Sequence, residues 1–580
     1  MANGYKVEEG TGIKDRHHVL MLAGPGSPFF QWLLLAAAST ISRLLVAHSM
    51  LSPTTEELCS RLNKSGKQRQ KQWRPRSKTG CFTCRIRRVK CDESKPSCRK
   101  CTSTGRKCDG YEGPSNKRTK STLTYTHNLV QVPSDWNLVG HNSMENTYFN
   151  YFRMVTIPSL TGFFDSGIWS YRLPQVSHHY PALWHAMAAL ASLHWDFLEE
   201  ETPITPVRVS QSNRVQFALR QHTKSIQLLR EMISWTRLTV HDKLAILGTC
   251  IIYICLFSLQ GLHWESFKHI GGALMICYNW RLEFEAHDSV DMSPLVVLLA
   301  QLDSQARPMF LLQQLPIPWA QTQFALPAPQ THFTSLPEAH ESLEVHINNM
   351  LQVVTSGSDI AAAEGPAKLE KCHEDFRQWD ERLARYLATS SPDRENKGLN
   401  ILYLRRLYAK VLLCLDPSKG ELGHDDFIDD YAQMLQLVGT ILEDESLEEA
   451  LTPALIQPKR HFSLESTVTE AFFLIAARCR EPMIRQKALK YMKLYPRREG
   501  ICGTMLALHA GEKLIEIERT ACQTAPLGSC THGRWVCANH RMAVLRFADL
   551  TGERVSFEML TAEEAKRGIP GRVFIFQKTR

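Results

Sequence analysis

The segment Cys81–Cys108, which reads CFTCRIRRVKCDESKPSCRKCTSTGRKC, dictates its own fold more directly than any other part of the chain. Its spacing is Cys81-x2-Cys84-x6-Cys91-x6-Cys98-x2-Cys101-x6-Cys108, so Cys-x2-Cys-x6-Cys occurs twice with a period of 17 residues. A Cys-x2-Cys turn allows both thiolates to bind one soft cation at about 2.3 Å. The spacing therefore predicts a small module that folds around metal.

The number of cysteines limits how many metal ions this module holds. Four thiolates complete one tetrahedral zinc site and would leave two ligands over. Two zinc ions are satisfied when two thiolates bridge, and the symmetry of the spacing favours Cys81 and Cys98 as the bridges. Three disulfides are the alternative, but they do not explain the repeat and require an oxidising compartment. The odd total of 17 cysteines, with no dense framework elsewhere in the chain, indicates a reducing compartment.

Positive charge is concentrated around the same segment. Residues 61–120 contain 20 Lys and Arg against 4 Asp and Glu, whereas the other 520 residues carry 48 basic and 55 acidic side chains. The formal net charge of +9 therefore arises in about one tenth of the chain. Such a density of charge indicates a polyanion-binding segment, because phosphates neutralised by Lys and Arg release their counterions when nucleic acid binds.

The segment resembles the fungal-type Zn(2)-Cys(6) binuclear cluster of transcription factors, through its six cysteines, the basic stretch after the second cysteine, and Pro96. The resemblance covers about 30 of the 580 residues. It implies one zinc bound by Cys81, Cys84, Cys91 and Cys98, and another bound by Cys98, Cys101, Cys108 and Cys81. It also implies a short helix after Cys81 that enters the DNA major groove at a CGG-like half-site, with Arg87 and Arg88 contacting bases.

The basic residues of the module have two expected roles. The family very often has Lys at the position of Arg88, and an arginine there can bind guanine O6 and N7 bidentately. On a regular helix Arg88 would face the metals, four residues after Cys84, so we expect the helix to loosen by about residue 88. Contacts with phosphates are expected mainly from Arg85, Lys90, Arg99 and Lys100.

The rest of the chain reads as a large, mainly α-helical regulatory domain. Apolar residues recur at helical spacing in Pro181–Leu198 and Val215–Ile233, and the all-apolar Leu244–Leu259 is better explained as a fully buried helix than as a membrane span. Further helices are expected at 370–390, 398–415, 426–443, 466–480 and 503–520, with loops at 286–294, 315–338 and 355–366. YFNYFRMVTIPSLTGFFDSGIW and the following HYPALWHAMAALASLH resemble the regulatory region common in fungal zinc-cluster factors.

Changes of composition predict the domain boundaries. The predicted parts are an N-terminal extension at 1–59, a basic arm at 60–80, the zinc module at 81–111, a linker at 112–143, the helical domain at 144–525, and a C-terminal segment with a short hairpin at 526–580. The basic clusters Lys64–Lys78 and Lys117–Lys120 fit nuclear import signals and phosphate-binding arms equally well. The apolar stretch Phe29–Ser42 is too short and interrupted for a membrane span, and no membrane partner is expected.

No arrangement of residues typical of catalysis emerges from the sequence, and we expect the protein not to be an enzyme. Lys64-Ser65-Gly66-Lys67 lacks the spacing of a phosphate-binding loop. The cluster Cys530-x-His532-x4-Cys537-x2-His540 contains zinc-ligand residue types, but its irregular spacing favours coincidence over a third zinc site.

Together these features predict a nuclear, zinc-dependent, sequence-specific regulator of RNA polymerase II transcription that binds double-stranded DNA. Transcriptional co-regulators are a further class of partner. The alternative is a protein-interaction scaffold whose zinc module is purely structural, and the basic residues between Cys84 and Cys91 argue against it. No run of heptads follows the module, so the protein is expected to be either a monomer on one half-site or a homodimer formed through the helical domain.

Overall fold

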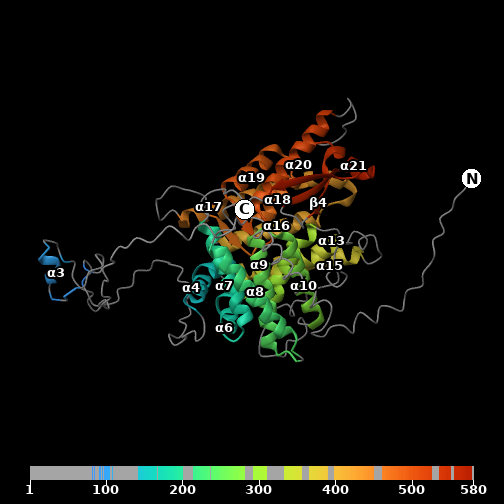
Figure 1. The fold of residues 1–580 in the computed structure, drawn as a ribbon. Helices are drawn as coiled ribbons and strands as arrows, with labels where there is room; N and C mark the ends of the chain where they lie inside the picture. Colours follow the sequence, from blue (N-terminus) through green and yellow to red (C-terminus); the bar gives the residue numbers. More distant parts are fainter. Residues whose placement is uncertain are drawn as a thin grey trace, which may run out of the picture. The chain divides into compact units, whose positions relative to one another are not determined.

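The chain is described from a computed structural model (Figure 1). The structure describes residues 142–165, 167–199, 213–235, 237–280, 292–309, 332–355, 365–389, 397–449, 460–524, 534–549 and 554–577, together with 81, 84, 91, 92, 94, 95, 97–104 and 108. The zinc module and the body that begins at Asn142 belong to two compact units.

The first half of the body is built from helices that share one large hydrophobic core. They are α4 (Ser143–Tyr151), η3 (Phe152–Thr156), α5 (Ile157–Thr161), η4 (Ile168–Arg172), α6 (Leu173–Ser177), α7 (Pro181–Glu199), α8 (Asn213–Ile233), α9 (Val240–Leu259), α10 (His263–Trp280), α11 (Ser293–Ala306) and η6 (Arg307–Met309). Figure 1 shows α7, α8 and α9 side by side, and α7 packs on both of the others.

Helix α9 lies at the centre of this core. A capping box starts it, because the Thr239 side chain accepts from the Asp242 N–H and the Asp242 carboxylate accepts from the Thr239 N–H. Helix α9 is long and apolar enough to span a membrane, but 94% of its most apolar 18-residue stretch is buried within the body. The buried helix expected at Leu244–Leu259 is therefore found, extended by four residues at its N-terminal end.

The second half of the body has its own hydrophobic core. Its helices are α13 (Leu336–Thr355), α15 (Gly365–Thr389), α16 (Lys397–Leu413), η8 (Pro417–Phe427), α17 (Ile428–Glu449), α18 (Thr469–Arg478), α19 (Pro482–Leu494) and α20 (Thr504–Thr524), of which α13, α18 and α20 contribute to both cores. Trp379 on α15 is almost fully buried, and its indole N–H donates to the carbonyl of Ala339 on α13. The five later helices expected from the sequence are all present within a few residues of the predicted bounds.

One loop prediction needs correction. A loop was expected to continue to residue 338, partly because of Pro337, but α13 begins at Leu336. Proline is tolerated in the first turn of a helix, where its missing N–H would have no partner within the helix. The Ser335 hydroxyl also accepts from the Glu338 N–H, which caps this turn.

Two small sheets complete the body. In one, β1 (His461–Ser463) pairs in parallel with β2 (Arg497–Glu499), which pairs antiparallel with β3 (Cys502–Gly503). In the other, β4 (Met542–Asp549), β5 (Arg554–Thr561) and β6 (Arg572–Gln577) form an antiparallel sheet, with α21 (Ala562–Lys566) between β5 and β6 and η9 (Ala538–His540) before β4. The hairpin expected near the C-terminus is therefore part of a three-stranded sheet. Met542, Val555 and Phe557 from this sheet join the first core, so the sheet packs on the helices.

The structure thus confirms the expected fold class: a cysteine-rich module and a large, mainly α-helical body. Buried ion pairs also link elements of the body. Arg480 and Arg485 both donate to Glu518 on α20, and Arg541 donates bidentately to Asp425 on η8. All three guanidinium groups are buried, and removal of Glu518 would leave the buried charge of Arg485 without its partner.

Candidate metal centre and nucleic-acid interface

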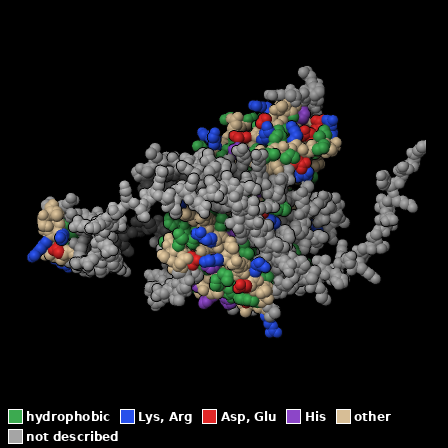
Figure 2. Space-filling model, viewed as in Figure 1, with side chains coloured by type: hydrophobic (Ala, Val, Ile, Leu, Met, Phe, Trp, Pro, Cys, Tyr) green, Lys and Arg blue, Asp and Glu red, His purple; other side chains and the backbone are tan. Residues whose placement is uncertain are grey.

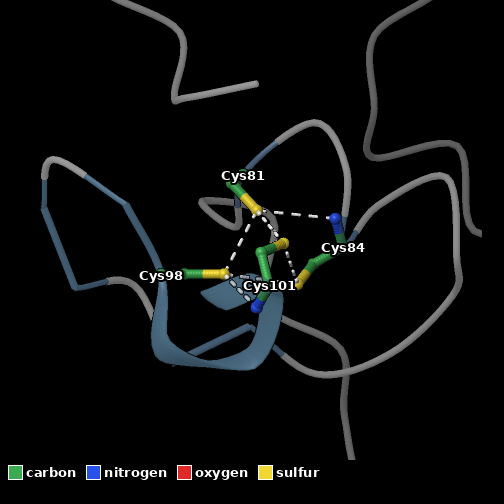
Figure 3. A group of neighbouring side chains, drawn as sticks. All are labelled: Cys81, Cys84, Cys98 and Cys101. Carbon is green, nitrogen blue, oxygen red and sulfur yellow. Dashed lines mark hydrogen bonds between the residues drawn. The ribbon is translucent and has the colours of Figure 1, made fainter. Parts of the chain in front are cut away.

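The zinc module has a core of sulfur. Cys81, Cys84, Cys91, Cys98 and Cys101 are buried, and Cys108 packs against them. Figure 3 shows the thiols of Cys81, Cys84, Cys98 and Cys101 directed toward one another. All six cysteines predicted as ligands therefore come together, and no disulfide joins them.

The repeat in the sequence becomes an approximate twofold symmetry of contacts. In the first half, the Cys84 N–H donates to Cys81 Sγ over 3.4 Å, and the Cys81 N–H donates to Cys91 Sγ over 3.5 Å. In the second half, the Cys101 N–H donates to Cys98 Sγ over 3.3 Å, and the Cys98 N–H donates to Cys108 Sγ over 3.5 Å. The first cysteine of each half thus occupies the same position relative to its partners.

The distances between the sulfur atoms fit metal coordination. Cys81 Sγ lies 3.5 Å from Cys98 Sγ and 3.8 Å from Cys101 Sγ, and Cys84 Sγ lies 3.6 Å and 3.8 Å from the same two atoms. A Zn–S bond of about 2.3 Å in a tetrahedral site places neighbouring sulfurs roughly 3.8 Å apart, whereas a disulfide places them about 2.05 Å apart. The four thiols therefore have the spacing of zinc ligands.

Burial also indicates that the cluster needs cations. It raises the pKa of the Cys81, Cys84 and Cys98 thiols, because a thiolate loses its hydration there. With zinc bound, these cysteines would be held as thiolates, because coordination favours the deprotonated form. The residues present therefore fit two zinc ions, which would cross-link the halves of a module too small to fold on an apolar core.

A residue that the sequence analysis did not single out, Asp92, organises the second half. Its carboxylate accepts from the backbone N–H groups of Arg99 and Lys100, over 3.0 and 3.1 Å, and from the Ser94 hydroxyl over 2.5 Å. These bonds lower the pKa of Asp92, the Ser94 hydroxyl contributing most. Because Arg99 begins the short helix α3 (Arg99–Thr102), the carboxylate caps that helix. An acidic residue directly after the third cysteine was the only signal of this role in the sequence.

Two of the predicted DNA-binding residues lie within the described part of the module. Arg99 and Lys100 are exposed on α3, and Lys95 is exposed on the loop before it. Figure 2 shows Lys and Arg side chains on the surface of this part of the module. The other four predicted contacts, Arg85, Arg87, Arg88 and Lys90, lie outside the described residues.

Of the irregular cluster near the C-terminus, the described half forms a close pair. Cys537 Sγ and His540 Nδ1 are 3.1 Å apart, and His540 Nε2 lies 3.6 Å from a Glu563 carboxylate oxygen. Cys530 and His532 lie outside the described residues. The groups of three or more metal-ligating side chains found among the described residues all lie in the zinc module.

Comparison with known families gives the same assignment as the geometry. The model described as "Fungal Zn(2)-Cys(6) binuclear cluster domain" matches residues 79–118. The chain carries a fungal Zn(2)-Cys(6) binuclear cluster domain. The cofactor of this zinc-cluster domain is a pair of zinc ions, and the structure brings the six cysteines together as a binuclear cluster requires.

Several curated proteins are similar to parts of the chain. The aspercryptin biosynthesis cluster-specific transcription regulator atnN of Emericella nidulans is 31% identical over 252 residues, which cover 40% of each chain. The Zn(2)-C6 fungal-type transcription factor afumD of Aspergillus fumigatus is 34% identical over 153 residues, covering 25% of this chain and 39% of its own. An uncharacterized transcriptional regulatory protein of Schizosaccharomyces pombe is 35% identical over 146 residues, covering 23% of this chain and 26% of its own.

The chain thus matches between 26% and 40% of the length of these relatives. A match of 252 residues is longer than the zinc-cluster domain, so the likeness to atnN extends beyond it. No solved structure matches the chain.

Proposed function

We propose that this protein is a sequence-specific DNA-binding regulator of RNA polymerase II transcription that acts in the nucleus. The observation that carries the proposal is the twofold sulfur cluster within a segment of 20 basic and 4 acidic residues. The metal centre provides a rigid module, and the surrounding charge provides affinity for phosphates. The names of the similar proteins, which are transcription regulators and factors, support the same function.

Within this proposal the basic residues have separate tasks. Arg87 and Arg88 would contact bases of a CGG-like half-site, where an arginine can donate two hydrogen bonds to one guanine. Phosphate contacts would come from Arg85, Lys90, Arg99 and Lys100. Exposure of Arg99 and Lys100 beside a buried metal cluster supports this second role, because their charges project from a surface that the cluster holds fixed.

The proposed organisation keeps the predicted boundaries. The arm at 60–80 and the linker at 112–143 would flank the zinc-cluster domain, and the helical body would receive co-regulators or a second copy of the chain. Sedimentation of the full chain, with and without a duplex that carries one half-site, would distinguish a monomer from a homodimer.

A gel-shift titration with zinc-loaded protein tests the function. Wild-type protein is expected to bind a CGG-containing duplex more tightly than a scrambled one. Arg88→Ala is expected to lower the ratio of these two affinities by roughly ten-fold or more. Arg230→Ala is a matched control, because Arg230 is exposed on α8, outside the zinc-cluster domain. Equal binding of both duplexes by the wild-type protein would contradict sequence-specific recognition.

The salt dependence separates the two classes of contact. Lys100→Ala is expected to weaken binding to both duplexes alike and to reduce the slope of log K against log [salt] by about 1. A slope near zero in the wild-type protein would instead favour a zinc module that is purely structural.

A further inference from the structure

A cavity in the helical body is lined by three arginines. It has a volume of about 80 Å3 and lies among the end of α7, the turn between α9 and α10, the β2–β3 hairpin and the start of α20. Arg460, Arg497 and Arg498 line it, and the described lining residues include no Asp or Glu. A small cavity with low-dielectric walls and guanidinium groups concentrates anions, because the field inside it is poorly screened.

The arginines are held in place by the fold. Arg498 Nη1 donates to the carbonyls of Ser258 and Leu259, at the C-terminal end of α9. Arg497 Nε donates to Glu499 over 2.8 Å. The guanidinium carbons of Arg460 and Arg498 lie 5.4 and 5.7 Å from the centroid of the Phe197 ring, so two positive groups gather at one aromatic side chain.

The remainder of the lining is apolar. Ile501, Met505, Leu506 and Val555 contribute alkyl or thioether surface. Together with Phe197 they would surround a hydrocarbon group, whereas the arginines would bind a negative one. Since one water centre needs about 10–15 Å3 of such space, the cavity has room for roughly five to eight water-sized groups.

The cavity is better suited to binding than to covalent chemistry. Cys502 lines it, but burial and then the charge of Glu470 raise the pKa of that thiol to about 12. A thiol with such a pKa is a poor nucleophile at neutral pH. The His263 ring also lines the cavity, and its Nδ1 is 2.8 Å from the carbonyl oxygen of Ile501, which fixes the ring.

We infer that this cavity is a binding site for a small carboxylic acid with an apolar body, its carboxylate beside Arg460 and Arg498. An arginine can bind a carboxylate through two parallel N–H···O bonds. A carboxylate alone would leave the apolar walls without contact, and a neutral hydrocarbon would gain nothing from the positive charge of the lining. The site lies wholly within the helical body, so the inference holds whether or not the zinc-cluster domain binds DNA.

Benzoate is a suitable probe, with benzamide as its neutral counterpart of the same shape. Full-length, zinc-loaded protein would be titrated with each compound and followed by saturation-transfer NMR of the ring protons and by calorimetry. Benzoate is expected to bind at least ten-fold more tightly than benzamide, because charge-assisted hydrogen bonds to arginine are lost with the amide. Equal binding of the two compounds, or no binding of benzoate at millimolar concentration, would overturn the inference.

Two variants localise the binding. Arg460→Gln is expected to weaken benzoate about ten-fold, and Met505→Trp, at a half-buried position of the lining, is expected to abolish binding by filling the cavity. Arg230→Gln on α8 is the matched control and should leave affinity unchanged. Wild-type affinity in both lining variants would place the benzoate elsewhere, for example on the basic segment 61–120, and would refute the site. If inorganic phosphate displaced benzoate at a concentration below that of benzoate, the apolar walls would not contribute to binding. That result would refute the assignment of a ligand with an apolar body.

Discussion

At the scale of single residues, Cys98 connects the two halves of the sulfur cluster. Its thiol lies 3.5 Å from Cys81 Sγ and 3.6 Å from Cys84 Sγ. The same thiol caps α3 by accepting a hydrogen bond from the Cys101 N–H. Its own N–H donates to Cys108 Sγ. A bridging thiolate at this position would be a ligand of both zinc ions, so its loss would affect the two sites together.

Replacement of Cys98 by serine tests this reasoning. Cys98→Ser is expected to lower bound zinc from two ions per chain to one or none, because a serine hydroxyl is a poor ligand for zinc beside thiolates. Plasma mass spectrometry of dialysed protein measures the zinc content, and Cys414→Ser is the control, since Cys414 is an exposed thiol on the helical body. A variant that retained two zinc ions would show that Cys98 does not bridge.

The cysteine ligands were predictable because their spacing alone encodes a chelate, and the structure confirms that all six come together. The role of Asp92 was not predictable. Its carboxylate reaches N–H groups seven and eight residues later, and only the folding of the loop around the metals brings them within 3.0 and 3.1 Å. A single acidic residue in a basic segment carries no periodic signal, so its partners had to be seen in the structure.

At the scale of elements, the start of helix α18 depends on a strand that is distant in sequence. The Glu499 carboxylate on β2 accepts from the backbone N–H groups of Thr467, Val468 and Thr469, over 2.9 to 3.0 Å, and from Arg497 Nε. Burial alone would raise the pKa of Glu499, but Arg497 and these hydrogen bonds outweigh it and lower the pKa to about 2. The carboxylate therefore satisfies N–H groups that a helix start leaves without partners.

Glu499→Gln is expected to destabilise the body by about 3 kcal/mol at neutral pH, since it leaves Arg497 buried without its counter-charge. The stabilisation from Glu499 is fully present above its ordinary pKa, near 4.5, and is lost as the pH falls toward 2. Thermal unfolding at pH 7 and about pH 3 would therefore show a smaller difference at the lower pH. Glu516→Gln, which breaks the exposed pair with Lys513, should cost less than about 1 kcal/mol; equal losses in the two variants would contradict the capping role.

The elements that sequence reasoning found and missed differ in a physical way. Long amphipathic helices such as α15 were predictable, because their apolar residues repeat at 3.6-residue spacing on one face. The β1–β2–β3 sheet was not, because its strands are two or three residues long and too short to show alternation. Its existence depends on the packing of β1 beside β2, more than 30 residues later in the chain.

At the scale of the whole molecule, the helical body contains several histidines in environments that exclude their charged form. Burial lowers the pKa of six of them: to about 4 for His194, His222, His340 and His346, to about 3 for His269, and to about 2 for His424. They belong to both hydrophobic halves of the body, so they act on its stability as a group. The sequence did not predict their burial, since single histidines within apolar helices look alike whether they face the core or the solvent.

Because of these histidines, we expect the free energy of unfolding of the helical body to fall in acid. Each has a folded-state pKa below its ordinary value near 6.5, so its contribution is complete above that pH and is lost as the pH falls toward 4. In that interval the unfolded chain binds protons that the folded chain does not, and each histidine adds up to about 1.4 kcal/mol per pH unit. Urea midpoints measured at steps from pH 7 to 5 are therefore expected to fall steeply.

His269→Phe isolates one contribution to this slope. The His269 ring stacks on Phe257, at 5.1 Å between centroids, and neither of its nitrogens has a hydrogen-bond partner among the described residues. A phenyl ring of similar shape removes these desolvated polar atoms, so the variant should be at least as stable as the wild type at pH 7. As the pH falls from 6.5 to 5 it should lose less stability than the wild type, by up to about 1.4 kcal/mol per pH unit. His373→Phe, at an exposed position on α15, should leave the slope unchanged. An unaltered slope in His269→Phe, or stability that does not change between pH 7 and 5 in the wild type, would show that these histidines are hydrated or paired in solution.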